Sequence, residues 1–290
     1  YGILTGYLNI TSSVAYYTFV NNMISMNNPN LGTSNDLSVV GIRDFNTSPS
    51  VQKYFYNSVY ITGANIAGGV NPSYCFYNDY ALNQTQRNNI YVNNRSGGGN
   101  HYAFGNAAGS WGTGSSDYNF FASPATAKAA LWSATGSTFS TWTSSSGSDA
   151  NSLYAQSTAS ASNYTTNPTT ATVNPAAGKL FGDPSDYTTA NKFLHISYTD
   201  GVSYQFVSNN GTDLSSSSIT TDFDGDTRGT TNPSPDKGAD EFTVPTLDMA
   251  VTTLANPTNT SCHSGTENVT VTIKNNTSNA IDFSVNNVTV

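Results

Sequence analysis

The residues best suited to chemistry form an acidic group around Gly225. Asp222, Asp224 and Asp226 alternate on either side of this glycine, which permits the sharp turn that would bring several carboxylates onto one cation. Carboxylate oxygens in such a turn suit Ca²⁺. Pro233 stands where an EF-hand loop starting at Asp222 would carry its last glutamate, so the segment is not an EF-hand loop. One interpretation is therefore a Ca²⁺ site at Asp222, Asp224 and Asp226.

The other interpretation of these residues is structural. Asp236, Asp240 and Glu241 follow shortly, and Arg228 lies between the two groups of acids. Arg228 would then pair with Asp240 or Glu241 in a charge-assisted contact. The whole segment would form the last turn of the repeat described below, together with its connecting loop. Both interpretations stay open at the level of the sequence.

Catalysis by paired carboxylates is a weaker alternative. Cleavage or elimination on a polysaccharide needs clustered acids, or acids beside a base, on one face. Asp79 and Asp117 stand beside aromatic residues in different repeats, and basic residues are sparse, with Arg87 and Arg95 the nearest. We therefore expect no catalytic residue and no enzyme, with a carbohydrate-active lyase or hydrolase as the alternative.

Histidine and tryptophan add little chemistry. The three histidines are too scattered to predict a metal cluster or a catalytic triad, and each is expected to be an ordinary strand or loop residue: His101, His195 and His263. Trp111, Trp132 and Trp142 could offer an apolar platform for sugars. Core packing is favoured for Trp132 and Trp142, because both lie in apolar, strand-like runs.

The composition excludes several classes of protein. Only 10% of the 290 residues are charged, against roughly a quarter in an average soluble protein. Ser, Thr, Asn and Gly fill the difference, which favours strands and turns over helices. A net charge of −8 argues against a nucleic-acid partner, and no apolar run is long enough for membrane insertion. Because the chain opens at Tyr1, we expect it to be a fragment of a longer protein.

A repeat organises the first half of the chain. Four segments each carry one or two asparagines followed by alternating apolar and polar residues, with equivalent positions at Asn22, Asn57, Asn89 and Asn119. The spacings are 35, 32 and 30 residues, a period typical of a solenoid, propeller or array. Turn residues follow each segment, and then a second apolar strand, as at 73–77 and 101–104.

The content of the repeat favours a parallel β-helix. No helical period is visible between the strands, which counts against leucine-rich or helical repeats, and the Trp-Asp signature of a WD propeller is missing. Stacked turns can align identical side chains, so the asparagines are expected to form a hydrogen-bonded ladder at one corner. Further strands are expected at 193–198 and 202–207, and a loop at 155–177.

A composition break at 243–245 separates a second region. Three strands are expected beyond it, at 247–251, 269–273 and 281–285, as at the start of a β-sandwich that the remaining residues cannot close. Cys75 and Cys262 fall in different regions and could be free, paired together or paired elsewhere.

Together these phrases resemble the right-handed parallel β-helix repeat domains of large surface proteins exported by Bacteroidota. The likeness rests on the asparagine segments at 57–60, 87–93 and 116–119, on 148–152, and on the closing phrase from Asp222 to Arg228 and from Pro235 to Phe242. It covers most of residues 15 to 242. The region from Leu247 looks like the opening of the Ig-like (CARDB-like) module that follows such helices.

The resemblance implies an all-β chain in two domains. Residues 1–242 would be a right-handed parallel β-helix and residues 243–290 the start of an Ig-like β-sandwich. The parent would be a type IX-secreted protein, extracellular or on the cell surface, with this segment in a non-catalytic structural or adhesive role. Surface glycans or other cell-surface and secretion proteins would be its partners. Apart from Ca²⁺ in the one interpretation of Asp222, Asp224 and Asp226, no cofactor is expected.

Overall fold

A computed structural model of the chain describes residues 2–6, 16–28, 38–47, 50–66, 68–80, 83–125, 128–156, 164–166, 180–182, 193–197, 203–244, 249–257, 266 and 268–275. The chain divides into two compact units, residues 1–197 with 203–242 and residues 198–202 with 243–290. Helices long and apolar enough to span a bilayer do not occur in the described ranges.

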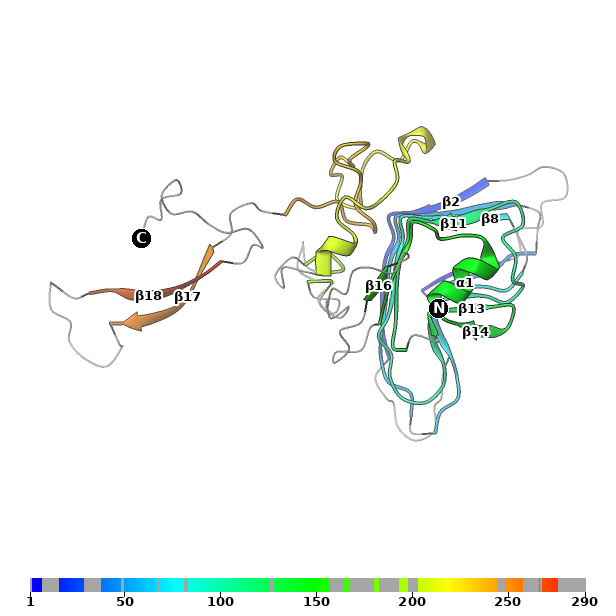
Figure 1. Cartoon of the computed structure of the whole chain (residues 1–290), viewed down its shortest axis with the longest axis horizontal. Helices are drawn as coiled ribbons and strands as arrows, with labels where there is room; N and C mark the ends of the chain where they lie inside the picture. The colour runs from blue at the N-terminus through cyan, green and yellow to red at the C-terminus, as the bar shows by residue number, and fades with distance from the viewer. Residues whose placement is uncertain are drawn as a thin grey trace. The chain divides into compact units, whose positions relative to one another are not determined.

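The first unit contains a parallel β-solenoid of about four turns (Figure 1). Sheet A runs, in spatial order, β1 (Ile3–Gly6), β4 (Val39–Phe45), β7 (Ser73–Asn78), β10 (His101–Asn106), β13 (Ala130–Trp132) and β14 (Thr135–Ser137). Sheet B runs β2 (Tyr16–Val20), β5 (Val51–Phe55), β8 (Asn83–Arg87) and β11 (Ser115–Asp117). Sheet C runs β3 (Met23–Asn28), β6 (Ser58–Gly63), β9 (Ile90–Asn93), β12 (Phe120–Ser123), β15 (Leu153–Gln156) and β16 (Tyr164–Thr166).

The prediction of stacked parallel turns is confirmed, while right-handed winding stays a prediction. The turns from β1 to β12 each contribute one strand to each sheet, and neighbouring turns pair in parallel, except where β14 and β16 pair antiparallel at the sheet edges. Sequence reasoning recognised two strands in each repeat and missed part of sheet B. The reason is visible in β8, where Gln84 and Gln86 are the residues that point inward and are buried. A strand with a polar inner face gives no apolar alternation.

The predicted asparagine ladder is present at the corner between sheets B and C. Asn22, Asn57 and Asn89 each donate a side-chain N–H to the Oδ1 of the next asparagine, at 2.7, 2.9 and 2.9 Å, the last acceptor being Asn119. The backbone N–H of each donates to the same oxygen. Asn57, Asn89 and Asn119 are fully buried. The ladder therefore satisfies polar groups that would otherwise be costly inside the protein.

A left-handed residue precedes every asparagine of the ladder. Asn21, Tyr56, Asn88 and Tyr118 have φ angles between 53° and 58°. Only glycine adopts this region without strain, although asparagine tolerates it better than most residues. This backbone turns the chain from sheet B into sheet C.

Ser152 and Asp149 end the ladder in the last turn. Ser152 occupies the position of the asparagine, and its Oγ accepts the N–H of Asn119 at 2.8 Å. Asp149 is fully buried, and its Oδ1 accepts hydrogen bonds from Ser116, Asn119 and Ser152. The Asp149 carboxylate thus accepts the hydrogen bonds that a further ladder asparagine would otherwise have accepted.

Aromatic side chains stacked from turn to turn fill the interior. Phe76 stacks on Phe104 with ring centres 5.2 Å apart, and Phe104 stacks on Trp142 at 5.3 Å. The rings of Tyr91 and Phe121 also pack from turn to turn, with centres 5.8 Å apart and planes tilted by 37°. Trp142 is fully buried, which confirms the prediction of core packing for it, and Trp132 packs partly buried against the same core. Burial of such rings is the main favourable term in the fold.

The short helix α1 (Phe139–Ser146) was not predicted, because its residues resemble a strand in composition. Thr138 caps its N-terminus by accepting the Thr141 N–H, and Gly147 ends it in the left-handed conformation. Figure 1 shows α1 within the outline of the coil. Its buried residues, Phe139 and Trp142, pack on the aromatic core at the last turn.

Other expectations need correction. The strand expected at 202–207 is a 3₁₀ helix, η3 (Ser203–Phe206), and a second 3₁₀ turn, η4, follows (Ser215–Ser217). Residues 193–197 form an isolated antiparallel bridge between Ile196 and Phe181 rather than a strand. Most of 155–177 lies outside the described residues. Cys75 is a free thiol buried in the core, while Cys262 falls outside the described part of the chain.

The second unit contains one antiparallel pair among its described residues. β17 (Met249–Asn256) pairs with β18 (Thr270–Asn275), close to two of the predicted strands. The third predicted strand, at 281–285, lies outside the described residues. An Ig-like sandwich is therefore not established by this small sheet.

Substituting Asn89→Ala tests the ladder. The change leaves the Asn57 amides and the Tyr54 carbonyl without their buried partner. We expect the free energy of unfolding to fall by about 3 kcal/mol, measured by urea denaturation with an unchanged slope. Asn210→Ala is the control, because Asn210 is exposed and its amide bonds stay within its own loop. Equal losses for the two variants would contradict a special role for the ladder.

Candidate functional site

The sequence-predicted site residues lie in a segment that packs along the outside of the asparagine corner. This closing segment, residues 203–242, has little regular secondary structure. Thr221 accepts the side-chain amide of Asn21, and Thr212 accepts the hydroxyl of Tyr56 and the amide of Asn88 at 3.1 and 2.7 Å. These partners belong to three successive turns. The expectation that the segment forms the last turn is therefore wrong, because it runs across the turns instead of stacking on them.

The left-handed corner residues explain why the segment binds there. Their side chains point outward, while the ladder asparagines after them point inward. Asn88 presents its whole amide, since its Oδ1 also accepts the Thr212 N–H at 2.9 Å. The Asn88 carbonyl accepts the Gly238 N–H at 2.7 Å. The corner thus offers a row of polar groups that a partner strand would normally satisfy.

Acidic side chains hold the closing segment together by accepting backbone N–H groups. Asp222 accepts the amides of Asp224 and Asp226 with one oxygen and that of Glu241 with the other. Asp236 accepts the amides of Asn209 and Phe242. Such bonds replace a helix or sheet ladder for the backbone of a segment that is only partly buried.

Arg228 links the segment to the solenoid. Its guanidinium lies 3.8 Å from the centre of the Tyr56 ring, donates to the Asn21 Oδ1 at 2.9 Å, and forms an ion pair with Glu241 at 3.2 Å. It also donates to the Gly238 and Ala239 carbonyls. The predicted pairing of Arg228 is confirmed with Glu241. Because the side chain is 1% exposed, these contacts lie away from water.

The amine of Lys237 lies next to Asn119, the last asparagine of the ladder. The side chain is buried, and its Nζ donates to the Asn119 carbonyl at 3.5 Å. Burial lowers the pKa of Lys237 to about 7, although the charges of Asp117 and Asp149 oppose that shift. Burial also raises the pKa of Asp149 to about 6. A neutral amine and a neutral acid are therefore accessible here near physiological pH.

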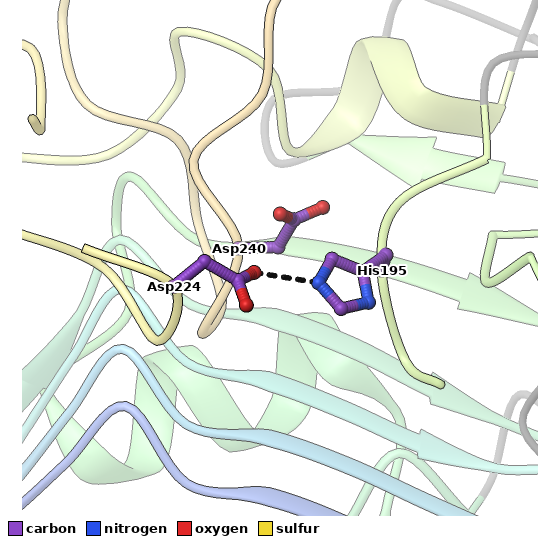
Figure 2. A group of neighbouring side chains, drawn as sticks. All are labelled: His195, Asp224 and Asp240. Atoms are coloured by element: carbon purple, nitrogen blue, oxygen red, sulfur yellow. Dashed lines mark hydrogen bonds and ion pairs between the residues drawn. The ribbon is translucent and has the colours of Figure 1, made fainter. Parts of the chain in front are cut away.

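A histidine joins two acidic residues in the same unit (Figure 2). His195 Nε2 lies 2.6 Å from Asp224 Oδ2, and Asp240 accepts the Ile196 N–H at 2.7 Å. One potential ligand atom from each of His195, Asp224 and Asp240 lies within 4.8 Å of the others. In the described ranges this is the one group of three such residues. Sequence reasoning missed it, because 29 residues separate His195 from Asp224.

The three aspartates predicted to hold Ca²⁺ have different surroundings. Both oxygens of Asp222 accept backbone amides, Asp224 faces His195, and Asp226 is exposed. The loop does turn sharply at Gly225, where φ is 95°. The ligand geometry found here brings Asp224 to His195 and Asp240, and calcium binding by the aspartates stays a prediction.

The remaining candidates make structural contacts. Asp79 pairs with Arg43 through two bonds of 2.8 Å, and Asp117 accepts two N–H groups of Asn151. Arg95 is buried and donates to Asn65. His101 lies in β10 as an ordinary strand residue against Ser73, whereas His263 lies outside the described residues.

Comparison of the chain with protein-family models, with curated proteins and with solved structures finds no significant match.

Replacing Arg228 by methionine tests the attachment of the closing segment. Methionine keeps an apolar stem but leaves the largely buried Glu241 without its cation. We expect a local loss of about 3 kcal/mol, and hence roughly hundredfold faster hydrogen exchange at the Gly238 and Ala239 amides. Lys274→Met, at an exposed position of β18, is the control. Unchanged exchange in the Arg228 variant would refute the anchoring role.

The titration of Asp149 gives a pH test. Burial raises the pKa of Asp149 from its ordinary value of 3.8 to about 6, so the folded state binds the proton more tightly. Stability should therefore fall as pH rises from about 4 to about 6. Asp149→Asn mimics the protonated acid and keeps the oxygen that accepts three bonds. The variant should be more stable than the parent by about 3 kcal/mol at pH 8, with the two converging below pH 4. Parallel stability curves would contradict this assignment.

Proposed function

We propose that this chain is a non-catalytic structural segment of a large secreted cell-surface protein, with adhesion as its role. The observation that carries the proposal is that the acidic side chains of the solenoid are occupied by internal hydrogen bonds. Each of the four acidic residues described between residues 2 and 156 accepts hydrogen bonds from neighbours within the solenoid: Asp44, Asp79, Asp117 and Asp149. Groups committed in this way stiffen a fold and are poorly placed to exchange protons with a substrate.

The interior supports the same role. Asparagine, glutamine and aromatic columns fill the coil along its axis, so each turn is stabilised by the turns beside it. A solenoid built in this way keeps its spacing and offers a long outer surface. The low content of charge, 10% of residues, fits a segment that is exposed outside the cell and makes neutral, hydrogen-bonding contacts. We propose surface glycans or other cell-surface proteins as its partners.

The finer assignment follows the sequence phrases that resemble Bacteroidota surface proteins. We propose a right-handed winding, export by type IX secretion, and an Ig-like module beginning at residue 243. In support, the closing phrase from Asp222 to Phe242 forms a defined structural unit at the asparagine corner. The β17–β18 pair is the support for the second module.

Incubation with polysaccharides tests the non-catalytic role. The chain should release no reducing ends and no unsaturated products from pectins, alginate, hyaluronan or bacterial glycans, relative to a heat-unfolded sample. Turnover above that control would overturn the proposal in favour of a carbohydrate-active β-helix.

Adhesion needs its own assay. The chain displayed on a non-adherent cell should increase retention on glycan- or cell-coated surfaces, compared with an unrelated solenoid of similar length displayed in the same way. Equal retention for the two would remove the adhesive part of the proposal and leave the structural part.

A further inference from the structure

His195, Asp224 and Asp240 converge from three stretches of the first unit. Figure 2 shows the imidazole facing the Asp224 carboxylate, with the Asp240 carboxylate beside them. One nitrogen and two carboxylate oxygens lie within 4.8 Å of one another, close enough for one ion to replace the present His195 to Asp224 contact. Three ligands that arrive from separated segments fix a cation without a dedicated loop motif.

The burial of the Asp240 carboxylate points to a bound cation. The residue is only 6% exposed, and Oδ2 accepts the Ile196 N–H. Within the described part of the chain, its other oxygen has no hydrogen bond. The Asp224 carboxylate lies beside it, in the same group of potential ligand atoms within 4.8 Å of one another. A buried carboxylate beside other carboxylates is costly unless a positive charge accompanies it.

The imidazole is also incompletely satisfied. His195 Nδ1 is buried and has no hydrogen-bond partner among the described residues, so the ring is held through Nε2 alone. A metal ion on one ring nitrogen requires that nitrogen to be deprotonated, and the proton passes to solvent or to the other nitrogen. The Asp224 contact meanwhile orients the ring toward the two carboxylates.

The ligand types discriminate between cations. Ca²⁺ takes six to eight oxygens, but Asp222, a further carboxylate of the same loop, already accepts backbone amides with both oxygens. Imidazole nitrogen with two carboxylates suits Zn²⁺, which binds three protein ligands and leaves a fourth position for water. We propose that His195, Asp224 and Asp240 bind one Zn²⁺ ion. The ion ties the 193–197 stretch to the closing segment.

Metal titration of the full 290-residue chain tests this site. After removal of metals with a chelator, ZnCl₂ should bind at one equivalent by calorimetry and raise Tm by roughly 5 °C at about a hundredfold excess over the dissociation constant. CaCl₂ and MgCl₂ at the same concentrations should do neither. His195→Gln and Asp240→Asn should each weaken Zn²⁺ binding by about tenfold or more.

Two matched variants serve as controls for Zn²⁺ binding. Asp226→Asn changes an exposed acid in the same loop, and His263→Gln changes a histidine beside Cys262, so both should bind Zn²⁺ as the parent does. Asp224→Asn, at a side chain 38% exposed, provides a second ligand variant should His195→Gln fail to fold. Absent Zn²⁺ binding, loss in the His263 variant alone, or Ca²⁺ binding that Asp226→Asn abolishes would overturn the proposal.

Discussion

In the solenoid the chain passes from sheet B into sheet C through a left-handed residue that is followed by an inward-pointing side chain. The hydrogen bonds at this corner constrain both the register of the stacked turns and the position of the closing segment. The inward asparagine must form hydrogen bonds with the turn before it and with the turn after it. Its amide does both, because Oδ1 accepts two N–H groups from one neighbouring turn while Nδ2 donates to the other. A side chain one atom shorter, such as Ser152, completes the contact only with the help of Asp149. The ladder thus fixes the register of the stack.

The same corner also determines where the closing segment lies. An inward asparagine forces the residue before it to point outward, and these outward groups would be left exposed along one edge of the coil. Thr212, Thr221 and Arg228 bind them across three turns. Because the segment lacks a sheet of its own, its carboxylates accept its backbone N–H groups, and those interactions concentrate acids in one place. The His195, Asp224 and Asp240 group is a consequence of this packing.

The repeat could be predicted because its physical cause is local. Asn22, Asn57, Asn89 and Asn119 recur at a nearly constant spacing, and the apolar alternation after each of them is the ordinary signature of a buried strand. The strands of sheet B were harder, since Gln84 and Gln86 fill inner positions where an apolar residue is expected. Helix α1 was missed because eight residues rich in Ser and Thr give no helical period, although Thr138 and Gly147 are ordinary capping residues.

What the sequence determined by itself is therefore the repeated strand, its period and the identity of the ladder residue, since each depends on contacts between equivalent positions. It also offered an acidic partner for Arg228 as one of two open interpretations, because opposite charges close in sequence can meet in one loop. Only the tertiary structure decided that residues 203–242 run across the turns, and that His195 meets Asp224 and Asp240. These contacts join positions with no periodic relation, so only the packed chain brings them together.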